Sequence, residues 1–447
     1  MSNAKYHLSP EQLAVAEEKR LKRQANRSAA QRNSSEPQRQ PQFLARPWVS
    51  LSDSCKDVPG AYTVKIMTWN ILAQCLMRSE LFPTSGKSRK AAERERMIHD
   101  ELIFYDADIM CLQEADRQDK LLPVLKNAGY SYTYATGPLK PHGCVVAYKQ
   151  DMFRTVGEKV VQYDDVEARE NAPVSPQARI ASSHRTKNIG SLVALERVDT
   201  DKVGYIVATT HLFWHPAYTY ERARQAGLLL REVVRWRDLM QLHDWPCIIA
   251  GDFNFSPEDP AYSLLVGDPL AAEQKHSLDV SRVVHVSIDP GVSMSSTTEP
   301  EEGEEGDPDR VIRNSRVAEI SDGLLSDSEL LDLFRCRLRS AYDEGQRVYK
   351  AMATPTDVVT FGDRIPFSTA RLGTNEPMWT SYTHYWKTTL DYIFFLDSPR
   401  THTEVIGYLQ PHRTENVIQG LPQLRICGSD HFSLCAQLRT SISPCEE

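Results

Sequence analysis

Short apolar runs that end in polar residues recur along most of the chain. VKIMTWNIL, which begins at Val64, and DADIMCLQE, which ends at Glu114, have the composition of buried strands. The intervening AAERERMIHDELIFY predicts a helix, and residues 220–242 carry an apolar face at helical spacing. Further strands are expected at residues 143–148, 191–196, 203–211, 247–253, 389–395 and 431–438. Strands interleaved with helices predict an α/β domain built in layers.

Two segments depart from this pattern. Residues 1–60 are expected to form a disordered basic head with one short helix, because the first fifty residues carry nine Lys or Arg, four Glu and few large apolar groups. Residues 268–328 predict an acidic disordered insertion, since seven of the eleven residues at 299–309 are acidic. The chain then divides into the head, a main domain at 61–440 interrupted by 268–328, and a tail at 441–447.

Composition narrows the class of protein. No apolar run is long enough for a membrane helix, so no membrane partner is expected. We expect an intracellular protein that acts in the cytoplasm, in the nucleus or in both, and the nucleolus is one possible nuclear site. The nine cysteines form no CxxC pair, which disfavours a disulfide framework or a zinc cluster. The net charge of -8 argues against a broad basic surface, but much of it comes from residues 268–328, so a nucleic-acid substrate is not excluded.

Several expected strands end in residues that can do chemistry. Asn70, Glu114 and His211 each follow an apolar run, as do Asp252 and Asn254 in GDFN, and Asp391, Asp430 and His431 come late in the chain. Each alone also fits a structural role, such as a turn former, a helix N-terminal charge or a packed histidine. As a set at one sheet edge, their oxygen donors suit Mg²⁺, or alternatively Mn²⁺. A divalent ion with a nearby carboxylate base favours hydrolysis of a phosphodiester.

Six motifs in this order resemble the endonuclease/exonuclease/phosphatase superfamily. They are TWN at 68–70, CLQE at 111–114, TTHL at 209–212, GDFN at 251–254, LDYIF at 390–394 and SDHFSL at 429–434. The resemblance implies an α/β four-layered sandwich of two packed β-sheets flanked by helices. It also implies one or two magnesium ions bound by Asn70, Glu114 and Asp430. The resemblance implies that Asp252 activates water and that Asn254 holds Asp252 and the phosphate in position. Asp391 and His431 would form a catalytic pair, and His211 would contact the phosphate.

Flanking residues resemble the deadenylase-like branch that includes nocturnin and the fungal Ngl-type RNA exonucleases. The supporting segments are NILAQ, DADIMCLQEAD, KPHGCVVAYK and THLFWHP, although His142 stands where branch members often have Asp. This branch implies a Mg²⁺-dependent 3′-to-5′ exonuclease that acts on single-stranded RNA 3′ ends and releases 5′-mononucleotides. Processing of ribosomal RNA 3′ ends and shortening of mRNA poly(A) tails are both compatible with it.

Contacts with RNA are expected from two kinds of side chain. Arg222 and Arg224 begin the helix after THLFWHP and would reach the phosphate backbone. Four aromatic residues would stack bases, namely Phe213, Trp214, Tyr382 and Trp386. The same residues also fit a solvated helix face and an aromatic core.

Two other functions remain open at this point. The chain could be another phosphodiesterase of the same fold, such as a DNA-repair nuclease, a phosphoinositide phosphatase or a sphingomyelinase. It could also be an inactive RNA-binding scaffold that meets protein partners through the basic head or the acidic insertion.

Overall fold

The computed structural model describes residues 42–51, 60–200, 202–293, 311–352, 358–365 and 371–442. Two large mixed β-sheets contain most of its strands. The seven-stranded sheet has the order β1 (Trp48–Ser50), β16 (Thr401–Leu409), β17 (Leu434–Ile442), β2 (Ala61–Asn70), β3 (Ile109–Ala115), β5 (Gly143–Lys149) and β4 (Tyr130–Ala135). The six-stranded sheet has the order β12 (Arg339–Ser340), β15 (Asp391–Leu396), β9 (Cys247–Asp252), β8 (Gly204–His211), β7 (Ile189–Arg197) and β6 (Phe153–Gln162).

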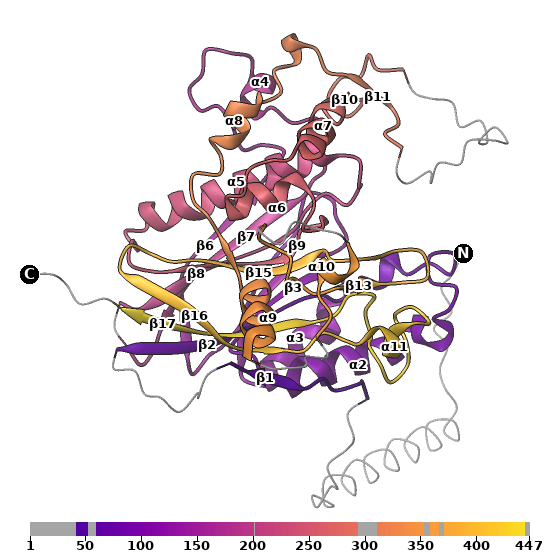
Figure 1. Cartoon of the computed structure of the whole chain (residues 1–447), viewed down its shortest axis with the longest axis vertical. Helices are drawn as coiled ribbons and strands as arrows, with labels where there is room; N and C mark the ends of the chain where they lie inside the picture. Colours follow the sequence, from indigo (N-terminus) through magenta and orange to yellow (C-terminus); the bar gives the residue numbers. More distant parts are fainter. Residues whose placement is uncertain are drawn as a thin grey trace, which may run out of the picture. The chain divides into compact units, whose positions relative to one another are not determined.

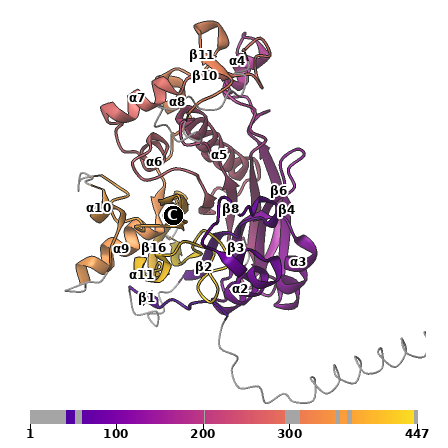
Figure 2. The same ribbon diagram turned by 90° about the vertical axis from the view of Figure 1, so that its right-hand side faces the viewer.

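Helices cover the outer faces of the two sheets. Figure 1 shows α5 and α6 along the side of the six-stranded sheet, and α2 and α3 along the side of the seven-stranded sheet; Figure 2 shows the same layers from the side. The described helices are α2 (Ala91–Phe104), α3 (Gln118–Asn127), α4 (Pro176–Ile180), α5 (Thr219–Leu239), α6 (Pro260–Val266), α7 (Ala272–Val280), α8 (Asp327–Leu331), α9 (Ala341–Met352), α10 (Phe361–Arg364) and α11 (Thr414–Val417). Short 3-10 turns lie at Gln74–Leu76, Gly86–Arg89 and Ile320–Asp322.

Three hydrophobic clusters hold the layers together. The central one joins the inner faces of the two sheets, for example Ile66 and Cys111 from one sheet with Val207 and Ile393 from the other. A second cluster packs α5 and α6 on the six-stranded sheet, and a third packs α2 and α3 on the seven-stranded sheet. Strand residues alternate between a sheet's two faces, and both faces are covered here, which explains why the central strands are continuous apolar runs. The predicted four-layered α/β sandwich is confirmed.

The segment at 268–328 is not a structureless insertion where the structure describes it. It contains α7, β10 (Val283–His285) paired with β11 (Ser315–Val317), and α8. Leu278 of α7 is buried in the cluster that covers the six-stranded sheet, and Arg316 binds the carboxylates of Asp289 and Asp322. The acidic composition concealed this, because part of the negative charge is used in such ion pairs. Residues 294–310, which include the whole acidic run at 299–309, lie outside the described residues.

The boundary of the expected head is also wrong. Residues 42–51 belong to the main domain, because Trp48 of β1 pairs with Leu409 of β16 and buried Arg46 binds Glu101 of α2 at 2.9 Å. The short helix expected in the head lies outside the described residues, as do residues 52–59 and 443–447. Within the described part of the chain, no helix is both long and apolar enough to span a bilayer.

Candidate active site

Strand pairing places most of the predicted site residues at one edge of the sandwich. In the six-stranded sheet, Asp252 at the end of β9 is paired with His211 of β8 on one side and with Asp391 of β15 on the other. In the seven-stranded sheet, Asn70 ends β2 beside β3. The Asn70 side chain joins the two sheets, because its Nδ2 donates to Glu114 Oε1 at 3.0 Å and to Asp252 Oδ2 at 2.9 Å.

Glu114 reaches this edge through an irregular strand. The register between β3 and β5 shifts between Leu112 and Ala115, and Glu114 lies in the left-handed region at φ 60°. Such a conformation costs a non-glycine residue about 1–3 kcal/mol, and bulges of this kind re-aim a side chain. The Ala73 backbone N–H offsets part of the cost by donating to Glu114 Oε2 at 2.8 Å. The bulge therefore directs Glu114 into the site.

His431 and Asp391 form a buried pair. His431 Nδ1 lies 2.8 Å from Asp391 Oδ2, and this contact leaves His431 Nε2 3.8 Å from Asp252 Oδ2 and 4.0 Å from Asp430 Oδ2. The Thr380 hydroxyl oxygen accepts the Asp391 backbone N–H at 3.0 Å. Ligand-type atoms of Asp252, Asp391 and His431 all lie within 4.8 Å of one another.

Asp252 is the centre of this arrangement. Its Oδ1 accepts the backbone N–H of Asn254 at 3.0 Å, and Asn254 in turn lies at φ 53° and donates from Nδ2 to the Leu212 carbonyl at 2.9 Å. Its Oδ2 faces both imidazoles, with His211 Nε2 at 3.6 Å, and His211 Nδ1 lies 3.8 Å from Glu114 Oε1. All eight residues predicted for metal binding or catalysis thus lie at this edge.

The two histidines have opposite protonation preferences. Burial opposes charge on His431, yet Asp391, Asp430 and Asp252 raise its pKa well above the ordinary value. Burial lowers the pKa of His211 to about 4. These opposite shifts favour an imidazolium at His431, which could donate from Nε2, and a neutral imidazole at His211. Environments that separate the pKa values of neighbouring groups are typical of acid–base sites.

The carboxylates also have distinct environments. Burial raises the pKa of Asp430 to about 6, and it raises the pKa values of Asp252 and Asp391. Burial also opposes the charge of Glu114, but His211 beside it and the hydrogen bonds from Asn70 and Ala73 keep its pKa below the ordinary value.

This donor set fits a divalent cation. Four buried carboxylates converge on a site where the nearest cation is His431, and Asp391 Oδ1 is buried without a hydrogen-bond partner among the described residues. Hard oxygen donors with excess negative charge are what Mg²⁺ and Mn²⁺ bind. Asn70 stays a predicted ligand. Its Oδ1 accepts the Leu72 backbone N–H at 3.0 Å, and its Nδ2 faces the carboxylates.

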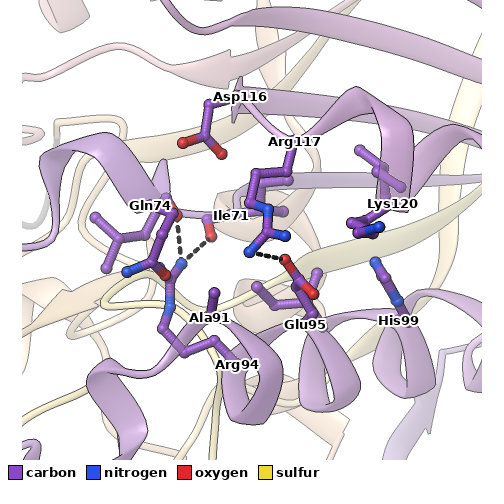
Figure 3. A pocket seen from close by; sticks show the side chains of 12 residues that line it. Ile71, Gln74, Ala91, Arg94, Glu95, His99, Asp116, Arg117 and Lys120 are labelled. Atoms are coloured by element: carbon purple, nitrogen blue, oxygen red, sulfur yellow. Dashed lines mark hydrogen bonds and ion pairs between the residues drawn. The ribbon is translucent and has the colours of Figure 1, made fainter. Parts of the chain in front are cut away.

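Arg94 of α2 anchors two loops that carry site residues. It donates to the carbonyl of Ile71 at 2.7 Å, to that of Leu72 and to Gln74 Oε1 at 3.0 Å in the loop after Asn70 (Figure 3). It also donates to the carbonyl of Gly428 at 2.7 Å, just before Asp430. The pocket in Figure 3 lies beside this anchor between α2 and α3. The sequence did not indicate a role for Arg94. The only signal is that Arg94 lies three and four residues before the apolar Met97 and Ile98, on the same face of the helix.

The predicted phosphate contacts on α5 are wrong. Arg224 is fully buried and binds Glu221 at 2.6 Å and the carbonyls of Tyr163 and Ile180. Arg222 is also buried and binds Asp259 at 3.0 Å. Both guanidinium groups are used to hold loops against the helix, because α5 is covered on nearly all sides at its beginning.

The four predicted stacking residues have different exposures. Trp214 is 55 % exposed and Trp386 is half-buried, with Nε1 donating to Ser381 Oγ at 3.0 Å. Phe213 and Tyr382 are buried, so neither offers a ring face for a base. The stacking hypothesis is therefore wrong for these two and stays a prediction for the two tryptophans.

Comparison with known proteins agrees with this geometry. The model of the Endonuclease/Exonuclease/phosphatase family matches residues 67–431. The chain belongs to this family. The predicted resemblance to the family and to its Ngl-type branch is thereby confirmed.

Similar proteins cover the chain to different extents. The "Probable RNA exonuclease C9B6.11c" of Schizosaccharomyces pombe is 34 % identical over 60 % of this chain, so the chain spans only about half, 53 %, of that relative. "RNA exonuclease NGL2" of Saccharomyces cerevisiae is 26 % identical over 97 % of this chain and 90 % of its own length. The crystal structure of ANGEL2, described as a 2′,3′-cyclic phosphatase, has a TM-score of 0.59 at 19 % identity and covers 89 % of this chain and 99 % of its own, which shows the shared fold.

Proposed function

We propose that this protein is a divalent-metal-dependent RNA exonuclease that works from the 3′ end and releases 5′-mononucleotides. The observation that carries the proposal is the convergence of Asp252, Asp391 and His431 within 4.8 Å, beside Glu114, in a member of this family. RNA as the substrate is supported by the relatives named RNA exonucleases, one of which aligns over 97 % of this chain.

Glu114 and Asp430 are the residues that would hold Mg²⁺ or Mn²⁺, as one or two ions. A bound divalent ion would neutralise negative charge on a phosphoryl group and on the leaving oxygen. Asn70 could join as a ligand only if its amide turned over, which would give up the hydrogen bond that Leu72 N–H donates.

The protein's own groups divide the chemical work. Asp252 Oδ2, which lies between the two imidazoles, would take the proton of the attacking water. His431, held by Asp391 and protonated, would donate from Nε2 to the phosphoryl oxygen on which charge builds up. The Asn254 backbone N–H orients the Asp252 carboxylate by donating to its Oδ1. Neutral His211 would position the phosphate.

The test is a degradation assay with 5′-labelled single-stranded RNA and Mg²⁺. We expect stepwise shortening that stops in excess EDTA and is lost in Glu114→Gln and Asp252→Asn. Glu93→Gln, which changes an exposed carboxylate of α2, serves as the matched control and should retain full activity. Activity that persists in EDTA or in both site variants would contradict the proposal.

The choice of substrate separates this proposal from its rivals. The same assay is run side by side on poly(A), mixed-sequence RNA, structured ribosomal RNA 3′ ends, RNA that ends in a 2′,3′-cyclic phosphate, and DNA. Preference for DNA would favour a repair nuclease, removal of the terminal phosphate alone would favour a phosphatase, and binding without any cleavage would favour a scaffold.

A further inference from the structure

A second pocket adjoins the carboxylate cluster. Its lining includes Glu114 and His211 from the candidate active site together with Lys140, His142 and Lys187. The site proper is dominated by carboxylates, whereas this pocket adds two lysines and a second histidine. The charge thus changes from negative at the carboxylate cluster to more positive at the adjoining pocket.

Backbone geometry places the two lysines at the same pocket. Lys140 lies in the turn between β4 and β5, where Thr136 Oγ1 donates to the His142 carbonyl at 2.8 Å and Lys140 N donates to the Gly137 carbonyl at 3.1 Å. This turn is pressed against the loop before β7, because a Cβ atom on Gly137 would lie 1.9 Å from the Lys187 carbonyl oxygen. Glycine at 137 therefore permits a close approach that any other residue would block.

The loop that carries Lys187 is fixed independently. The Asp164 carboxylate accepts the backbone N–H groups of Thr186 at 3.1 Å and of Lys187 at 2.8 Å, and Lys187 lies in the left-handed region at φ 58°. Asp164 is thus engaged with the backbone. Within the described ranges, neither Lys140 nor Lys187 forms an ion pair with a carboxylate.

Lys140 is held in place by a neutral partner. Its Nζ donates to Asn188 Oδ1 at 3.0 Å, and Asn188 Nδ2 donates to the His211 carbonyl. An ammonium has three N–H donors, so this bond leaves donor capacity for a ligand. Burial is the main cause that lowers the pKa values of Lys140 and His142, while the nearby Glu114 carboxylate opposes the shift in both. The pocket therefore offers two lysines as cationic contacts for an anion, beside the single carboxylate of Glu114.

We propose that this pocket binds a second phosphate group of the substrate, next to the phosphate that is cut, with Lys140 and Lys187 as its cationic contacts. The inference rests on the proposed function, since it assumes a nucleic-acid substrate. The second phosphate has two possible sources, which are the neighbouring internucleotide linkage and a terminal 3′-phosphate.

The experiment measures binding separately from cleavage. Equilibrium binding of short single-stranded RNAs is followed by fluorescence anisotropy in the Asp252→Asn background, with and without Lys140→Met. Methionine retains much of the aliphatic stem and removes the charge, and Lys187→Met provides a second variant. The control is Lys126→Met, which changes an exposed lysine of α3.

We expect Lys140→Met to raise Kd for RNA about tenfold and to flatten the plot of log Kd against log salt by about 0.7, the effect of losing one phosphate contact on a single strand. Lys126→Met should change neither. An RNA with a neutral methylphosphonate at the linkage next to the cleaved one should bind less well, and Lys140→Met should then add no further loss. A loss confined to RNA that ends in a 3′-phosphate would assign the pocket to that group instead.

Two results separate the failure of this inference from that of the proposed function. Unchanged affinity and salt dependence in both lysine variants, on all three RNAs, would overturn the pocket assignment. Tight, lysine-dependent binding together with absence of RNA cleavage by the unaltered protein would instead overturn the exonuclease proposal while supporting the pocket.

Discussion

Replacement of Asp391 by asparagine tests the role given to the buried histidine pair. His431 Nδ1 and Asp391 Oδ2 are 2.8 Å apart, and both side chains are buried, so solvent does little to screen their interaction. An asparagine oxygen can still accept from Nδ1, so Asp391→Asn removes the charge and keeps the shape. Hydrogen bonds to charged groups contribute about 1.5–3 kcal/mol, which converts to a fall in the cleavage rate of about 10- to 150-fold.

The same variant makes a prediction about pH. Asp391 is one of the carboxylates that raise the pKa of His431 well above its ordinary value. The protein as it stands should therefore keep protonated His431, and activity, as pH rises above the ordinary histidine range. In Asp391→Asn the pKa of His431 falls, so the alkaline loss of activity should begin at lower pH.

The assay is single-turnover cleavage of saturating 5′-labelled RNA with Mg²⁺ across a pH series, with circular dichroism to verify the fold. Asp244→Asn, at an exposed carboxylate that pairs with Arg400, is the matched control. A rate within twofold of the unaltered protein, with an unmoved alkaline limb, would refute the assignment of His431 as a charged donor oriented by Asp391.

Three further predictions concern stability. Arg94→Met should lower the free energy of unfolding in urea by at least about 3 kcal/mol, because it leaves several carbonyl groups at the site loops without their donor. Gly137→Ala should cost about 1–3 kcal/mol, since its Cβ would overlap the Lys187 carbonyl, and an unchanged urea midpoint would contradict that packing. Burial raises the pKa of Glu376 to about 8, so the folded state binds a proton that the unfolded state releases at lower pH. Stability should therefore fall as pH rises from about 4.5 to 8, and Glu376→Gln should make this fall smaller in denaturation curves taken across that range.

The central strands could be predicted because they are buried on both faces and therefore read as continuous apolar runs. β2, β3, β5, β7, β8, β9 and β15 all overlap their predicted ranges, and α2 and α5 are within a few residues of theirs. β4, β6 and β16 were missed. β6 shows why, since it is an edge strand whose residues alternate between exposed and partly or fully buried, so FRTVGEKVVQ has no apolar run to detect.

The positions of the candidate site residues followed from strand ends and motif order, but their interactions did not. The φ of Glu114 and the orientation of the Asn70 amide depend on contacts with distant segments, which no local pattern encodes. Arg224 shows the opposite error. An arginine at the start of a helix is usually solvated, and only the fold reveals that Glu221 and two carbonyl groups surround it.

Analysis of the released nucleotides by mass spectrometry, after cleavage of RNA in water enriched in ¹⁸O with Mg²⁺ present, tests the proposed reaction most directly. If Asp252 activates water for attack on the terminal phosphodiester, every released mononucleotide should be a 5′-monophosphate that carries one ¹⁸O in its phosphate, and Asp252→Asn should release none. Release of 3′-phosphates, or unchanged release by Asp252→Asn, would contradict the account.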